Sequence, residues 1–162
     1  MEFKHQENYT AKTKVADKNE LNRKLIEAIK AEDTKTVKDC IACGANVNSD
    51  DNNYNGKTTA LMYAVHGSNP KIAKLLIDAG ADVNAKSNHN NLTALMYAAS
   101  NGTIKTVELL ITANADILAV SDDGHSALVY ARNAENKKAI RFLSNLQKTK
   151  EKELVKIVKN RF

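Results

Sequence analysis

The chain repeats itself with a period of about 33 residues. The hexapeptide TALMYA begins at Thr59 and again at Thr93, 34 residues later, and the related SALVYA begins at Ser126, after a further 33. A second landmark follows the same period, and its copies are GANVN at 44–48, GADVN at 80–84 and NADIL at 114–118. Two landmarks with one period indicate a stack of one supersecondary unit, in which each unit buries its apolar face only against its neighbours.

Apolar side chains spaced three and four residues apart predict two helices in each unit. In the first unit Leu21 and Leu25 begin one such face, and Val37, Cys40 and Ile41 form the next. The helices predicted for the later units run over residues 59–65, from about 70 past 76, 93–100, 104–112, 126–133 and 137–146. The chain has one proline and no tryptophan, which favours helices over a sandwich or barrel.

The ends of these helices carry suitable capping residues. The first residue of each TALMYA-type landmark is Thr or Ser, which we expect to accept hydrogen bonds from free backbone N–H groups, each cap contributing about 1 kcal/mol. Gly44, Gly80 and Asn114 follow the second helices, where a left-handed residue commonly ends a helix. Pro70 is expected in a first helical turn, since its missing N–H would be unpaired there.

The two landmarks resemble the ankyrin repeat family, whose pattern runs G-x-T-P-L-H-x-A-A, then an apolar second helix, then G-A-D-V-N. The resemblance covers about Leu21 to Leu146. Two positions depart from it, with alanine in place of the family's proline and Met or Val in place of its histidine, at Ala60, Ala94, Ala127, Met62, Met96 and Val129. The resemblance implies an all-α solenoid of about four helix-turn-helix units. The apolar and basic residues of the tail predict a C-terminal amphipathic helix after it.

The resemblance, together with the composition of the two ends, divides the chain. We expect a weakly ordered or helical lead-in over residues 1–20, with four basic and four acidic side chains. The repeat domain follows over residues 21–146, in units 21–55, 56–90, 91–123 and 124–146, and residues 147–162 form a basic amphipathic helix. The connection SDDNNYN after Asn48 is about two residues longer than the usual ankyrin loop, and AKSNHN after Asn84 is one longer.

The positive charge is concentrated in the tail. Residues 147–162 hold six Lys or Arg and two Glu, a net charge of +4, which leaves +1 of the total +5 for the other 146 residues. The repeat body is therefore not built as a nucleic-acid groove. Three roles remain open for the tail: covering the apolar side of the last repeat, docking to a partner, or lying on an anionic membrane. We favour covering, since the end of a solenoid needs shielding.

No pattern of catalytic, cofactor-binding or metal-binding residues stands out. Gly56-Lys57-Thr58 matches the end of a phosphate-binding loop, but Asp51 stands where that motif needs its first glycine. His89 and His125 come from adjacent turns without a carboxylate or thiol at ligand spacing, so we predict no metal site. Tyr63, Tyr97 and Tyr130 share one position of the repeat, which predicts packing between units with hydroxyls exposed to water.

The cysteines and the N-terminal residues indicate the cellular compartment in which the protein is expected. Cys40 and Cys43 lie three apart on a predicted helix, in poor disulfide geometry, and suit a reducing compartment. The sequence lacks an apolar run near 18 residues and an N-terminal h-region, so as it stands it predicts a cytoplasmic monomer that spans no membrane. Secretion into a host or a removed signal stays open, and TALMYA looks like the repeats of bacterial ankyrin proteins.

The resemblance implies a non-catalytic module that binds a partner protein on a concave face of turns and inner helices. Carried over position by position, its contact residues are Asp50, Asn52, Tyr54, Lys57, His66, Lys86, His89, Asn90, Leu92, Ser100, Asn101, Val120, Asp122, Asp123, His125 and Asn133. Among these, Tyr54, Leu92 and Val120 are expected to contribute most, as apolar or aromatic side chains on exposed turns.

Two other functional classes remain open. A dedicated inhibitor or folding partner of one enzyme or toxin would bind that protein one-to-one and very tightly. An adaptor at an anionic surface, acting through residues 147–162, would bind in a way that weakens steeply with salt.

Overall fold

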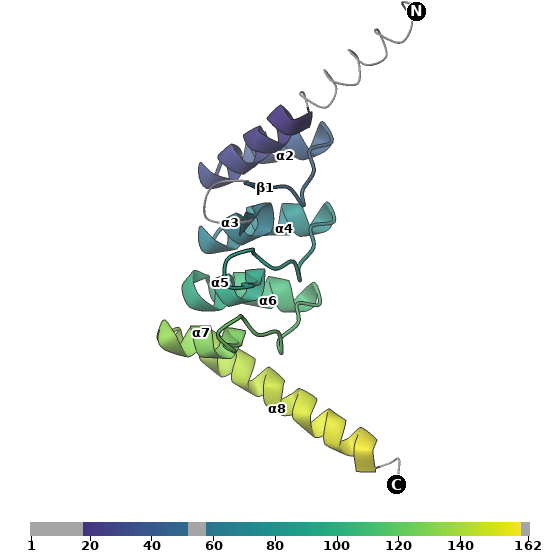
Figure 1. The fold of residues 1–162 in the computed structure, drawn as a ribbon, viewed down its shortest axis with the longest axis vertical. Helices are drawn as coiled ribbons and strands as arrows, with labels where there is room; N and C mark the ends of the chain where they lie inside the picture. Colours follow the sequence, from purple (N-terminus) through teal and green to yellow (C-terminus); the bar gives the residue numbers. More distant parts are fainter. Residues whose placement is uncertain (1–17, 52–57, 160–162) are drawn as a thin grey trace, which may run out of the picture.

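The computed structural model describes residues 18–51 and 58–159, with side chains as far as residue 152. Its helices stack in antiparallel pairs along one long axis (Figure 1). The pairs are a first helix over residues 18–30 with α2 (Thr34–Ala42), α3 (Ala60–His66) with α4 (Pro70–Asp78), α5 (Ala94–Asn101) with α6 (Ile104–Thr112), and α7 (Ala127–Asn133) with α8 (Lys137–Lys159). The predicted all-α solenoid of four helix pairs is confirmed.

One apolar core runs through the whole stack. The first helix of each pair, which we call the inner helix, packs on the inner helices above and below it, α3 on α5 and α5 on α7. Leu61 and Met62 of α3 are almost completely buried, and Leu95 and Met96 repeat them in α5. The equivalent apolar side chains of successive units thus form a continuous column.

Threonine and serine do not cap the inner helices equally. The Thr59 hydroxyl accepts from the Met62 N–H at 3.3 Å, and the Thr93 hydroxyl accepts from the Met96 N–H at 3.4 Å, as predicted. Ser126 makes no side-chain capping bond at the start of α7, so the prediction was wrong there. A residue type suited to capping does not guarantee the rotamer that makes the bond.

The second helices, which we call outer helices, end in two ways. Gly44, Gly80 and Asn114 follow α2, α4 and α6 with φ of 85°, 89° and 64°, the predicted left-handed ends. Each lies eleven positions after the residue that caps its helix, Asp33, Asn69 or Thr103. Eleven positions beyond Asn136, which caps α8, stands Gln147, a good helix former without a preference for φ > 0.

The fourth outer helix therefore does not stop. α8 runs without a break from Lys137 to Lys159, so the predicted boundary between residues 146 and 147 falls inside one helix. Its distal half leaves the stack at an angle and does not lie flat under the third unit (Figure 1). This differs from the expectation that residues 147–162 cover the last repeat; side chains beyond residue 152 lie outside the described part.

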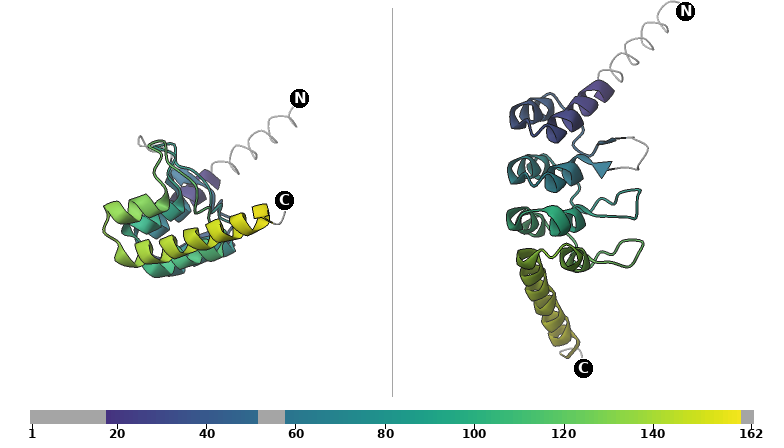
Figure 2. Two further views of the ribbon diagram at one scale, coloured as in Figure 1. Left: turned by 90° about the horizontal axis from the view of Figure 1, so that it is seen from below. Right: turned by 90° about the vertical axis from the view of Figure 1, so that its left-hand side faces the viewer.

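Between the pairs the chain forms extended turns, which we call fingers. In finger one, residues 49–59, β1 (Asp50–Asp51) pairs antiparallel with β2 (Thr58–Thr59). Single bridges repeat this pairing in finger two, residues 85–93, and in finger three, residues 119–126. Fingers two and three, and strands β1 and β2 of finger one, project to the same side of the stack (Figure 2).

A ladder of asparagine side chains joins the units near the bases of the fingers. Asn48 donates to the Gly80 carbonyl at 3.2 Å and accepts from the Asp82 N–H at 2.7 Å. Asn84 makes the same two bonds to the third unit, at 3.2 and 2.8 Å. Leu118 occupies the equivalent position in the third unit, so the ladder ends there.

Candidate functional site

The fingers and inner helices together form one face of the stack, which we call the finger face. Tyr63, Tyr97 and Tyr130, one in each of α3, α5 and α7, form a row along it. Each tyrosine is partly buried and packed against the core, which confirms the predicted packing role. Their hydroxyls are not simply exposed to water, because those of Tyr63 and Tyr130 bond to finger side chains.

A basic or imidazole side chain contacts each tyrosine of the row, from the end of the preceding inner helix for Tyr63 and Tyr97 and from a finger for Tyr130. The Lys30 ammonium lies 4.3 Å from the centroid of the Tyr63 ring, in cation–π range. His66 meets Tyr97 edge-on, with ring centroids 6.1 Å apart. His125 of finger three meets Tyr130 in the same way at 6.0 Å. Basic and imidazole groups therefore alternate with phenol rings along the finger face.

A charged cluster fixes finger one to the first two inner helices. Lys30 Nζ lies 2.7 Å from Asp51 Oδ2, and the Tyr63 hydroxyl donates to the same oxygen. The Asp51 hydrogen bond raises the pKa of Lys30, whereas burial, followed by the bond to Asp51, raises the pKa of Tyr63. The Asp51 side chain is only 10% exposed, so its charge is held by these partners and is not displayed to solvent.

Serine replaces this aspartate in the next two fingers. Ser87 is buried, donates from Oγ to the His89 carbonyl at 2.7 Å and accepts from the Leu92 N–H at 3.0 Å. Burial raises the pKa of Tyr97, and a hydrogen bond with Ser87 partly offsets this shift. These bonds fix the path of finger two from inside the turn.

Finger two is tied directly to finger three. Asn90 donates to Asp123 at 2.6 Å, and Asn91 donates to Asp122 at 2.5 Å. The Asp122 N–H donates to the Asn90 carbonyl at 3.2 Å. Both asparagines have positive φ, 61° and 49°, a conformation that asparagine tolerates well. The tips of the two fingers therefore form one connected surface.

The predicted contact residues fall into four groups. Those exposed without a described side-chain hydrogen bond or ion pair are His66, Lys86, His89, Val120 and Asn133; Asn101 is exposed but accepts a hydrogen bond from Ser100. Those exposed but hydrogen-bonded between fingers are Asp122 and Asp123. Those partly buried are Asp50, Asn90, Leu92, Ser100 and His125. Asn52, Tyr54 and Lys57 lie outside the described residues.

Leu92 is not the exposed finger side chain that we expected. It is partly buried and packed against the core, next to the buried Thr93 that caps α5. Its backbone carbonyl also accepts from the Ser87 N–H at 2.9 Å. Leu92 thus has a folding role, whereas Val120, at 47% exposed, does present an apolar side chain to solvent as predicted.

Sequence reasoning missed several residues of this region. Lys30 and Asn91 contribute to the finger face and were not among the expected contacts. Leu118, 54% exposed, was also missed. Its signal was present, because Leu118 interrupts a position that holds asparagine in the two preceding landmarks.

Metal-binding clusters, paired cysteines and membrane-spanning helices are absent from the described residues. Across residues 18–51 and 58–152, no three His, Cys, Asp or Glu side chains gather closely enough to hold a metal ion. Cys40 is buried and Cys43 is exposed, both with free thiols, and burial raises the pKa of Cys40. Within the described helices, none combines the length and apolar character needed to cross a membrane.

Comparison with known proteins agrees with this architecture. A family model of three ankyrin repeats matches residues 25–121 and again residues 83–154, so the two matches together extend from residue 25 to residue 154. A search of curated proteins found no significant match. Repeated landmarks, stacked helix pairs and the family match all lead to one conclusion: the chain belongs to the ankyrin repeat family.

Proposed function

We propose that this protein is a non-catalytic interaction module that binds a partner protein through the finger face. Ankyrin repeats in general serve as protein–protein interaction modules. The observation that carries the proposal is the preorganised pair of fingers two and three. Hydrogen bonds between Asn90, Asn91, Asp122 and Asp123 hold the two tips together, so little conformational freedom is left to lose on binding.

The side chains that remain available fit a protein surface better than a small ligand. Lys86, His89 and Val120 are exposed on these two fingers, and His66 is exposed at the end of α3. They combine one apolar anchor with polar groups that can donate or accept hydrogen bonds, which is the usual composition of a binding patch. Within the described residues, the large apolar side chains that stay exposed are Val120 and Leu118.

Affinity capture with matched variants tests the proposal. The face variant carries His66→Ala, His89→Ala and Val120→Ser, and the outer variant carries Lys71→Ala, Lys105→Ala and Lys138→Ala. All six positions are exposed, so both variants should keep the wild-type circular dichroism spectrum. The face variant also loses the ring contact between His66 and Tyr97, so its unfolding midpoint is measured to establish that it is folded during capture. The bait is used on lysate of the organism that carries the gene.

We expect a protein that wild type and the outer variant capture equally and that the face variant loses by about tenfold or more, equivalent to about 1.4 kcal/mol. Loss of that protein with the outer variant, and its retention by the face variant, would move the binding surface to the outer helices and overturn the proposal.

A further inference from the structure

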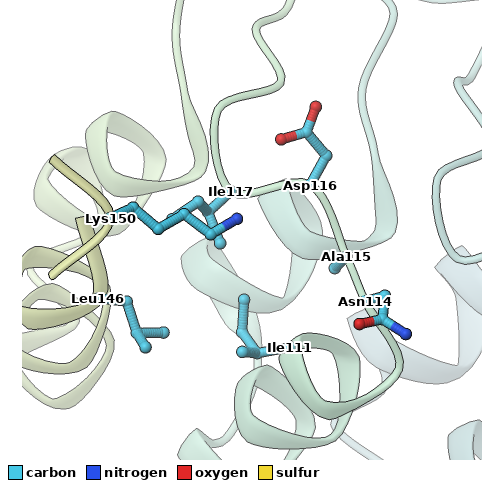
Figure 3. Close-up of a pocket in the computed structure, with 7 residues that line it drawn as sticks. All are labelled: Ile111, Asn114, Ala115, Asp116, Ile117, Leu146 and Lys150. Carbon is cyan, nitrogen blue, oxygen red and sulfur yellow. The ribbon is translucent and has the colours of Figure 1, made fainter. Parts of the chain in front are cut away.

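A second candidate surface lies at the C-terminal end of the stack, away from the fingers. The divergence of α8 leaves a cleft of about 360 Å³, lined by Ile111, Asn114, Ala115, Asp116, Ile117, Leu146 and Lys150. The side chains of Leu146 and Lys150 extend from α8 toward Ile111 and Ile117 (Figure 3). The cleft therefore has an apolar floor and a rim that carries one acidic and one basic side chain.

The cleft exists because two repeated features stop together. Leu118 replaces the ladder asparagine, and Gln147 replaces the left-handed residue that would turn the chain back under the third unit. Within the described residues, α8 runs on to Lys159 and forms no loop that covers Ile117, and the neighbouring Leu118 is 54% exposed. Leu118 does not line the cleft itself, but it follows the lining residue Ile117 in the chain and exposes apolar surface at the base of finger three.

The charge of α8 selects the kind of occupant. Lys148, Lys150 and Lys152 are exposed on its distal half against one described acidic residue, Glu151. Residues 147–162 carry a net charge of +4, compared with +1 for the rest of the chain. A second copy of this chain would bring two such segments together, and like charges at close range oppose association. An acidic occupant is attracted instead.

The shape of the site favours a helix. α8 extends about 18 Å beyond Gln147, at 1.5 Å per residue over its last twelve residues, and offers a straight edge beside the cleft. An amphipathic helix laid along this edge can insert apolar side chains spaced three and four apart while its polar flank faces the lysines. We propose that the cleft and the distal half of α8 bind an acidic amphipathic helix of a partner protein, independently of the finger face.

Fluorescence anisotropy with designed peptides tests this. The probe is a labelled peptide of about 18 residues, long enough to be partly helical, with leucines on one face and glutamates on both flanks. One control peptide has lysine in place of glutamate, and another has the probe's composition in an order that removes the apolar face. All are titrated with the full chain.

The protein variants separate charge from apolar contact. Lys148→Glu, Lys150→Glu and Lys152→Glu together reverse the α8 charge, while Lys35→Glu, Lys71→Glu and Lys105→Glu make the same change on α2, α4 and α6, where these lysines are also exposed. Leu118→Ser removes exposed apolar surface without changing charge. We expect about tenfold or greater weakening for the α8 reversal, several-fold weakening for Leu118→Ser and unchanged binding for the outer reversal.

Four results would overturn the proposal. These are no binding of the glutamate peptide, equal binding of the scrambled peptide, equal weakening by both charge reversals, and unchanged binding by Leu118→Ser. Phosphatidylserine vesicles and a DNA duplex are titrated in parallel. If either binds through the α8 lysines while the peptide does not, the tail is an anionic-surface adaptor and the helix-docking proposal is wrong.

Discussion

Two joints of the same stack are built differently on their outer sides. Between the second and third units, Asn84 bonds to two backbone groups of the next loop. There α6 ends at Thr112, and Asn114, with positive φ, turns the chain back. Between the third and fourth units, Leu118 makes no such bonds, and α8 continues away from the stack. On the inner side the joints are alike, because α7 packs on α5 as α5 packs on α3.

The difference shows that stacking in this chain has two separable parts. Apolar packing of the inner helices reaches the last unit, whereas the asparagine ladder requires a further loop and stops without one. The last unit is held near the inner helices, where Asn136 donates to the carbonyls of Ala99 at 3.1 Å and Gly102 at 3.3 Å. The outer side is left open and becomes a surface available for binding.

The largest expected effect comes from the inner part of the last joint. In Gly102→Ala the added Cβ would lie 2.5 Å from the Ala98 carbonyl oxygen and 2.6 Å from Thr106 Oγ1, so the backbone that Asn136 binds must shift. We expect a loss of about 1–3 kcal/mol in the free energy of unfolding, measured by urea denaturation.

Gly67→Ala is the matched control for this substitution. Its Cβ would meet nothing closer than 3.5 Å, and Gly67 has a φ of −69°, which alanine adopts freely. This variant should be unchanged or more stable by up to about 1 kcal/mol. Equal urea midpoints for the two alanine variants would show that the last joint does not depend on this close contact.

The contribution of the asparagine ladder can be measured by removing it at the joint that has it and making the same substitution at the joint that lacks it. Asn84→Ala removes two hydrogen bonds to backbone groups of the third unit and should cost about 1–2 kcal/mol. Leu118→Ala, at the equivalent position where no ladder bond exists, should change stability by less than about 0.5 kcal/mol. Equal decreases in the thermal unfolding midpoint of the two variants would contradict the distinction between the two joints.

The inner-helix caps give a smaller contrast between the same units. Thr93→Ala removes the hydroxyl that caps α5 and should cost about 1 kcal/mol. Ser126→Ala removes a hydroxyl that makes no capping bond to α7 and should stay within about 0.5 kcal/mol of wild type. Chemical denaturation gives the free energy of unfolding of both variants. A larger loss for Ser126→Ala than for Thr93→Ala would contradict the assignment of a cap to α5 and none to α7.

The smallest effect on stability is expected at Gln147. Gln147→Gly introduces the residue type that follows α2 and α4 and disfavours the helix locally by about 1 kcal/mol. Because the distal half of α8 extends past the stack, far-UV ellipticity should fall while the unfolding midpoint stays nearly constant. Gln147→Ala should preserve both, and a lowered midpoint for Gln147→Gly alone would mean that distal α8 supports the repeats.

The sequence predicted the repeated parts of the fold closely. α6 spans the predicted Ile104–Thr112, and α5 and α7 differ by about one residue, because two landmarks of equal period fix the register of every helix. The helix predicted for residues 137–146 instead continues to Lys159. A helix ends at a residue that favours ending it, and Gln147 does not.

The candidate site was less predictable, for geometric reasons. Val120 and Leu92 are both apolar finger residues in the sequence, yet one is exposed and the other packs inward, and the period of the repeat does not reveal that direction. The bonds between Asn90 and Asp123 and between Asn91 and Asp122 join residues more than 30 positions apart. Only the stacking of units brings these residues together.

Hydrogen–deuterium exchange of the captured complex tests the finger-face proposal most directly. We expect slower exchange on binding in fingers two and three, residues 85–93 and 119–126, and at the end of α3, with the outer helices α4 and α6 unchanged. Protection confined to α8 and the loop after α6 would assign that partner to the C-terminal cleft. Protection confined to α4 and α6 would contradict binding at the finger face.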